Sequence, residues 1–165
     1  MKRLPLFAVA LALVAAGCSS STTPSSTPPT KPTFTAALST ANEVPPITNA
    51  EAGGRGDATV TIDTTAGSVT FVVNLSGFPA GTPINIAHIH EAPAGTNGSV
   101  RVATTLAAGQ VVLSSTGTGS FTSVATGQDA ALLQTIINNP AGFYFNAHST
   151  LNGGGVVRGQ LVRVQ

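Results

Sequence analysis

The sequence has a single cysteine, no tryptophan and few charged residues. Of its 165 residues only 8% are charged, and aromatic residues make up 5%. With Cys18 as the only cysteine, the chain cannot form an internal disulfide, so the folded part must be held together by core packing and hydrogen bonding. Nucleic-acid binding would require a basic patch with interleaved aromatic residues, which is missing. The composition therefore argues against nucleic acid as a partner.

Several catalytic signatures are also missing. The serines occur without a G-x-S-x-G turn, and the folded region has no cysteine nucleophile. The acidic residues are scattered singly, so a glycosidase-like carboxylate pair has no local signature. The glycines at 153–155 are not followed by the strand–loop–helix context of a phosphate site, which indicates a turn.

The N-terminus reads MKRLPLFAVALALVAAGC. Lys2 and Arg3 precede an apolar run over residues 4–16, which is too short to span a bilayer comfortably and is typical of an export signal. The cysteine after small residues resembles the bacterial lipoprotein signal, although that pattern favours leucine at the position of Ala15. We therefore predict lipidation of Cys18 and anchoring to a membrane of the bacterial cell envelope. An ordinary signal peptide with an incidental cysteine is the alternative.

Three segments follow from this N-terminus. Residues 1–17 form the signal peptide, residues 18–32 a Ser/Thr/Pro-rich tether, and residues 33–165 one folded domain. The tether has no large apolar residue and cannot offset the entropy of ordering. Removal of the signal leaves 165 − 17 = 148 residues, with 7 − 2 = 5 basic and 6 acidic residues, so the net charge becomes −1.

The folded domain has the pattern of an all-β protein. Short runs rich in Val, Thr and Ile are separated by turn residues, and apolar and polar residues alternate clearly over residues 57–63. The segment DTTAGS at residues 63–68 indicates a hairpin turn. About eight or nine such runs predict an antiparallel β-sandwich or barrel.

One segment, TGQDAALLQTIINNPAG, has helical spacing instead. Thr126 is a candidate N-cap, and Asn138–Asn139–Pro140 would end the helix. The segment predicts a single short helix over one end of the domain. We expect its apolar stripe to be core rather than a partner-binding surface; the stripe consists of Leu132, Leu133, Ile136 and Ile137.

Two of the three histidines occur as a His-x-His pair. Successive side chains in a strand point to opposite faces, so a strand over residues 84–90 puts Ile84, Ile86, His88 and His90 on one face. The two imidazoles would then lie side by side, about 6.5–7 Å apart at Cα. This spacing allows both rings to bind one metal ion. A polar surface pair without metal is the alternative.

The third histidine lies in a similar position. In GFYFNAHS, Tyr144, Asn146 and His148 would share one face of a strand, and this run also ends before a loop. If the strands carrying His88–His90 and His148 are neighbours, the three imidazoles can meet. The sequence does not establish that they are.

Four motifs together resemble the CHRD domain, the module named for chordin and found alone in many bacterial exported proteins. They are NEVPP at 42–46, AHIHEAPAGTNG at 87–98, GFYFNAHS at 142–149 and VVRGQL at 156–161. The resemblance covers the folded domain and implies a β-sandwich. The family commonly carries an acidic residue where this chain has Val156. Chordin binds growth factors of the bone morphogenetic type, a role that a shared fold does not transfer.

A second resemblance concerns chemistry. A His-x-His pair followed by Glu91 and a glycine-rich loop is similar to the copper-binding stretch of copper/zinc superoxide dismutases, which share the immunoglobulin-like sandwich. This resemblance implies copper ligation by His88, His90 and His148 and a catalytic role for Arg158 in guiding the anion. The zinc ligands, bridging histidine and disulfide are missing, so no zinc is expected. Arg158 as a surface strand residue and Glu91 as a solvated charge, rather than a hydrogen-bond acceptor for an imidazole, are the alternatives.

These observations lead to three functional hypotheses. The first is an envelope-anchored, copper-only superoxide dismutase with one copper ion on three histidines, a ligand type that suits copper. The second is a non-enzymatic binding or adhesion module, and the third is passive copper sequestration. Both copper hypotheses require the three ring nitrogens to lie within about 3–4.5 Å of one another.

Overall fold

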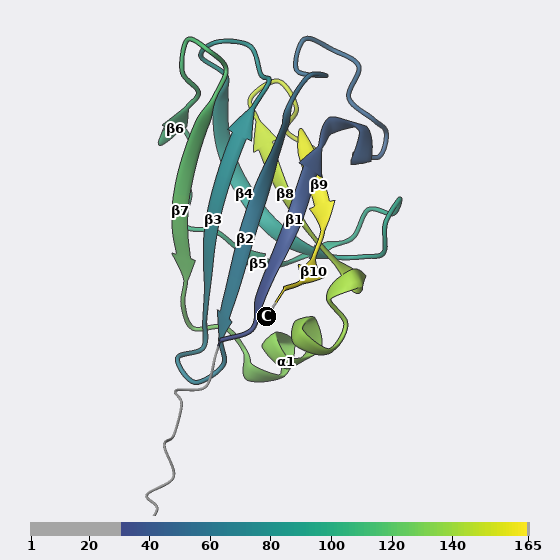
Figure 1. Ribbon diagram of the computed structural model, residues 1–165, viewed down its shortest axis with the longest axis vertical. Helices are drawn as coiled ribbons and strands as arrows, with labels where there is room; N and C mark the ends of the chain where they lie inside the picture. Colours follow the sequence, from purple (N-terminus) through teal and green to yellow (C-terminus); the bar gives the residue numbers. More distant parts are fainter. Residues whose placement is uncertain (1–30, 165) are drawn as a thin grey trace, which may run out of the picture.

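The computed structural model describes residues 31–164, which form a β-domain with one α-helix (Figure 1). The predicted signal peptide, Cys18 and the predicted tether as far as residue 30 lie outside the described residues. The Pro32 carbonyl accepts a hydrogen bond of 2.9 Å from the Ile62 amide. The described end of the predicted tether therefore contacts the domain.

The secondary structure consists of ten strands, one α-helix and two short 3₁₀ helices over the described residues. In chain order they are β1 (Thr33–Ser39), η1 (Thr40–Asn42), β2 (Arg55–Asp63), β3 (Ser68–Ser76), β4 (Pro83–Glu91), β5 (Ser99–Ala103), β6 (Val111–Val112), β7 (Gly119–Ala125), α1 (Ala130–Asn138), η2 (Pro140–Gly142), β8 (Phe143–Ser149), β9 (Val157–Gln160) and β10 (Val162–Arg163).

The strands form one antiparallel sheet that folds over into two layers. The main order is β5-β4-β8-β9-β1-β2-β3-β7, with β10 beside β1 and β6 beside β4. The strands β1, β2, β3 and β7 lie in front of β4, β8 and β9 in Figure 1. Because β6 also contacts β7, the sheet is nearly closed. The prediction of an all-β antiparallel sandwich with one short helix is confirmed.

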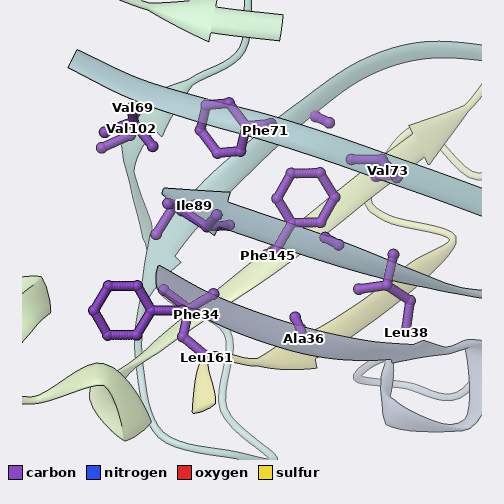
Figure 2. Packing of buried hydrophobic residues seen from close by; sticks show 14 of the residues in the cluster. Phe34, Ala36, Leu38, Val69, Phe71, Val73, Ile89, Val102, Phe145 and Leu161 are labelled. Atoms are coloured by element: carbon purple, nitrogen blue, oxygen red, sulfur yellow. The ribbon is translucent and has the colours of Figure 1, made fainter. Parts of the chain in front are cut away.

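The hydrophobic core lies between these two layers (Figure 2). Phe71 of β3 and Phe145 of β8 meet there, with ring centroids 5.8 Å apart. The predicted alternation in β2 is confirmed, because Ala58, Val60 and Ile62 are fully buried. Burial of each large apolar side chain contributes about 1.5–3 kcal/mol to stability, which helps a domain that forms no disulfide.

The turn between β2 and β3 is built as the sequence predicts. The Asp63 side chain accepts hydrogen bonds from the amides of Thr65 and Ala66, at 3.0 and 2.9 Å. Gly67 then adopts a φ of 60°, a conformation that glycine tolerates without steric cost. The predicted hairpin is confirmed by the antiparallel pairing of the two strands.

The helix α1 begins later than predicted. Its N-cap is Asp129, whose side chain accepts a hydrogen bond from the Leu132 amide at 2.9 Å, so the prediction of Thr126 as the cap is wrong. Its predicted end at Asn138 is confirmed, and its buried residues belong to the core, as expected. No helix among residues 31–164 is long and apolar enough to cross a membrane.

One predicted face of β4 also requires correction. A β-bulge lies between Ile84 and Ile86 on the side that pairs with β8. It turns Ile84 into the core, whereas Ile86 is 40% exposed on the outer face. Ile84 therefore does not share a face with His88 and His90, because the bulge shifts the alternation by one residue.

Candidate metal centre

The two strands that carry the histidines are neighbours in the sheet. In the ladder between β4 and β8, Ile86 pairs with His148 and His90 pairs with Tyr144. The side chain of His88 lies between these two pairs, on the face of the sheet opposite the core. The strand period and the pairing thus bring all three imidazoles to one place.

The three rings form a compact cluster. His88 Nδ1 lies 3.2 Å from His148 Nε2, and the ring centroids are 5.5 Å apart for His88 and His90 and 6.1 Å apart for His90 and His148. One ring nitrogen from each residue lies within 4.8 Å of the others. Ligands about 2 Å from one ion are at most about 4 Å apart, so these nitrogens would have to approach one another slightly to enclose an ion. The sequence left open whether the three histidines meet, and the structure brings them close enough to bind a metal ion.

Backbone carbonyls orient two of the rings. His90 Nδ1 lies 3.0 Å from the Gly98 oxygen, and His148 Nδ1 lies 3.0 Å from the Gly153 oxygen. Since a carbonyl only accepts, each Nδ1 carries the proton and each Nε2 keeps its lone pair. His90 Nε2 is buried without a hydrogen-bond partner. Metal-binding histidines commonly show this arrangement, in which a partner of one ring nitrogen frees the other.

Burial keeps the histidines neutral. The pKa of His88 falls from 6.5 to about 4, mainly because burial disfavours the charged ring and also because His148 and His90 lie close by. Burial likewise lowers the pKa values of His90 and His148, although their carbonyl partners oppose the shift. Neutral imidazole is the form that binds metal. The cluster is therefore in its ligand form at neutral pH.

Tyr144 supports the cluster and was missed by sequence reasoning as part of the site. Its ring stacks on His90, with centroids 4.9 Å apart and planes 5° apart. Its hydroxyl accepts a hydrogen bond from the Gly98 amide at 3.2 Å. The signal in the sequence was its place on the same strand face as His148.

Gly98 lies where the loop after β4 folds back onto that strand. A Cβ atom at this position would clash with the Glu91 carbonyl oxygen and with the Ala92 side chain. Only glycine allows this close approach without displacement of the loop. The approach sets the Gly98 carbonyl beside His90.

A second network fixes the glycine-rich loop after β8. The Ser149 hydroxyl donates to Glu51 Oε2 at 2.6 Å, and the Asn152 amide donates to the Ser149 hydroxyl at 2.9 Å. The Asn152 side chain also donates to Glu51 Oε2. These bonds hold the loop in which the Gly153 carbonyl meets His148.

Arg158 is buried, with 3% of its surface exposed. Its Nε donates to the Asn42 carbonyl, and its Nη1 donates to Asn97 Oδ1 at 2.8 Å and to the Thr96 carbonyl at 3.3 Å. The guanidinium carbon lies 4.7 Å from the centre of the Tyr144 ring. Arg158 is thus not a surface strand residue. Its guanidinium hydrogen-bonds to Asn42 and to the loop that contains Thr96 and Asn97.

Glu43 lies beside this arginine and is 5% exposed. Burial raises its pKa to about 7, although the charge of Arg158 opposes the rise. The carboxylate is 4.0 Å from Arg158 Nε, too far for a hydrogen bond. Glu43 Oε1 and Arg158 Nη2 are buried without partners.

The structure also shows the surroundings of Glu91 and Val156, the two other positions that the resemblances single out. Glu91 is exposed and pairs with Arg101 at 3.0 Å, which fits the solvated-charge alternative. The hydrogen-bond acceptors of His90 and His148 are backbone carbonyls, which residue identities do not reveal. Val156 is fully buried in the hydrophobic core, so an apolar side chain suits the position where the resemblance leads one to expect an acid.

Comparison with known proteins places the chain in a family. The model of the CHRD domain matches residues 34–161, which include the whole histidine cluster, both loops that orient it and Arg158. Comparison with curated proteins finds no significant match. Because the match spans most of the 165 residues, the chain belongs to the CHRD domain family.

Proposed function

We propose that this CHRD protein binds one copper ion through His88, His90 and His148. The observation that carries the proposal is the convergence of three neutral imidazoles, two of them oriented by backbone carbonyls. The ligand atoms would be Nε2 of His90, Nε2 of His148 and one ring nitrogen of His88. The unpaired, buried His90 Nε2 supports this, since a buried polar atom without a partner is costly unless a ligand completes it.

The ligand set favours copper over the other common metals. Imidazoles suit copper and zinc, and copper(II) stands at the top of the divalent affinity order. Structural zinc sites use four protein ligands, whereas the cluster among the described residues contains three histidines and no cysteine, aspartate or glutamate. Three histidines also hold zinc in some catalytic sites. Competition between the two metals therefore belongs in the test.

The activity we propose is superoxide dismutation. Copper supplies one-electron redox chemistry: one superoxide is oxidised to O₂, and a second superoxide, with two protons, is reduced to H₂O₂. His88 is only half-buried, whereas His90 and His148 are 8% and 6% exposed. The His88 side is accordingly where a small anion would approach. The surrounding residues of the domain cover the other two rings.

Passive copper sequestration is a second candidate with an observation of its own. A guanidinium that guides an anion should reach the solvent side of the site, but Arg158 is held by three backbone or side-chain oxygens beneath loops. Without such a guide, the same site would store copper without rapid turnover. Sequestration and dismutation share all three ligands and differ only in turnover.

The test is copper titration of the domain, residues 31–165, followed by a superoxide assay on the loaded protein. One copper per chain should bind, with at least about tenfold preference over zinc from the affinity order. His88→Ala and His148→Ala should each abolish stoichiometric binding and activity. Glu91→Gln is the matched control, because Glu91 is adjacent to His90 yet pairs only with Arg101 in solvent.

Each outcome decides between the candidates. Stoichiometric copper with dismutation supports the proposal, and stoichiometric copper without dismutation leaves sequestration. Equal binding by wild type and both histidine variants would contradict the site. Absence of copper binding would leave the non-enzymatic module, with the histidines as structural hydrogen-bonding groups.

A further inference from the structure

We infer that Asn97 and Arg158 are positioning residues that set the tautomer of His90. They act through the loop of residues 92–98, and neither touches the imidazole by any hydrogen bond that the structure shows. The inference rests on the proposed metal site, because the tautomer decides which nitrogen of His90 is free to bind the ion.

The first link is the contact between the loop and the ring. The Gly98 carbonyl accepts a hydrogen bond from His90 Nδ1–H, and the Gly98 amide donates a hydrogen bond to the Tyr144 hydroxyl. Both backbone polar groups of Gly98 are thus hydrogen-bonded. In water the proton of a neutral imidazole prefers Nε2, so this carbonyl must stay in place to hold it on Nδ1.

The second link fixes the loop itself. Asn97 precedes Gly98 and uses both ends of its amide: Oδ1 accepts from Arg158 at 2.8 Å, and Nδ2 donates to the Val44 carbonyl at 3.0 Å. Arg158 also donates to the Thr96 carbonyl. Two consecutive loop residues are therefore held by one buried guanidinium.

The third link is the rigidity of Arg158. It is 3% exposed, its Nε is bonded to the Asn42 carbonyl, and the Asn42 side chain donates back to the Arg158 carbonyl at 3.0 Å. A planar guanidinium donates in several fixed directions at once, whereas a lysine ammonium cannot reproduce that geometry. Arg158→Lys should consequently loosen the loop although the charge is kept.

The other oriented histidine provides an internal reference. His148 depends on the Gly153 carbonyl, and that loop is held by hydrogen bonds of Glu51 and Ser149 in which neither Asn97 nor Arg158 takes part. Loosening of the 92–98 loop should therefore change the tautomer of His90 and leave the tautomer of His148 unchanged. A general loss of structure would affect both.

The experiment reads the tautomers directly in the metal-free domain by ¹⁵N NMR of the imidazoles. Wild type should show the Nδ1–H form at both His90 and His148. Asn97→Ala, a change at an exposed residue, and Arg158→Lys should both move His90 toward the Nε2–H form and leave His148 unchanged. Asn85→Ala is the control, since Asn85 bonds to Thr150 on the outer side of β4.

A second measurement follows copper affinity. Loss of a group that orients a metal ligand typically costs about 10- to 100-fold in affinity, and we expect that loss in Asn97→Ala and Arg158→Lys. The inference is overturned if His90 keeps its tautomer in folded Asn97→Ala, or if Asn85→Ala changes it equally. Because the tautomer is read without metal, failure of wild type to bind copper would contradict the proposed function and leave this result intact.

Discussion

Single residues determine whether the cluster is ready for metal at a given pH. The strand period allowed His88 and His90 to be predicted on one face, and the motif GFYFNAHS placed His148 beside Tyr144 and Asn146. The carbonyl partners could not be predicted, because a backbone oxygen carries no residue identity. Arg158 was singled out from its motif, but its burial depends on loops whose path the sequence does not specify.

The lowered pKa values predict copper binding that persists in mild acid. Below its pKa of about 6.5, an exposed imidazole is mostly protonated, and its neutral, metal-binding fraction falls roughly tenfold per pH unit. Here His88 stays neutral down to a pH of about 4, and the pKa values of His90 and His148 are also lowered. Apparent copper affinity should therefore change less than about tenfold between about pH 7 and about pH 5.5, as measured by competition with a chelator of known acid constants.

The same shifts have a cost for the metal-free domain. Below the unfolded pKa of 6.5, the histidines of the unfolded chain take up protons, whereas in the folded domain His88 stays neutral until the pH approaches about 4 and the pKa values of His90 and His148 are also lowered. Stability of the apo form should fall as the pH decreases through that window. The competition experiment must therefore verify folding at each pH. A loss of affinity that begins at about pH 6.5 in folded protein would contradict the neutral cluster.

At the scale of elements, the pattern of apolar and polar residues predicted the strands and the helix but not the helix cap or the β-bulge. The apolar stripe of α1 is core as expected, but the cap is Asp129, three residues beyond the predicted one. The bulge that turns Ile84 inward arises in the pairing of β4 with β8, so it depends on a partner far away in the sequence. Local composition determines what an element is, and cross-strand pairing determines which residues it exposes.

The helix cap gives a prediction that separates stability from function. Asp129→Ala removes the acceptor for the Leu132 amide and should lower the free energy of unfolding by about 1 kcal/mol. The helix does not contribute a ligand, so copper stoichiometry and affinity should stay unchanged. Urea unfolding and copper titration of the same sample would check both. A parallel loss of copper binding would contradict this prediction, because it would show that the metal site depends on the overall stability of the domain.

At the scale of the whole molecule, the sheet order assembles the centre. It places β8 between β4 and β9 (Figure 1). The Tyr144 ring on β8 accordingly stacks on His90 of β4 and lies 4.7 Å from the guanidinium carbon of Arg158 on β9. Motifs that are far apart in the sequence thus meet on one outer face. The all-β sandwich and the CHRD family could be predicted from turn spacing and motifs. The adjacency of the strands could not, since it depends on long-range pairing. Lipidation of Cys18 stays a prediction.

The most direct test counts the nitrogen ligands of copper in the loaded domain. Electron paramagnetic resonance of the copper(II) form, with ¹⁵N-labelled histidine, reports the number of imidazoles through their hyperfine splitting. The cluster of His88, His90 and His148 predicts three imidazole nitrogens in wild type and two in any residual copper complex of His148→Ala. A wild-type spectrum with one or two imidazoles, or one unchanged by His148→Ala, would contradict the three-histidine centre.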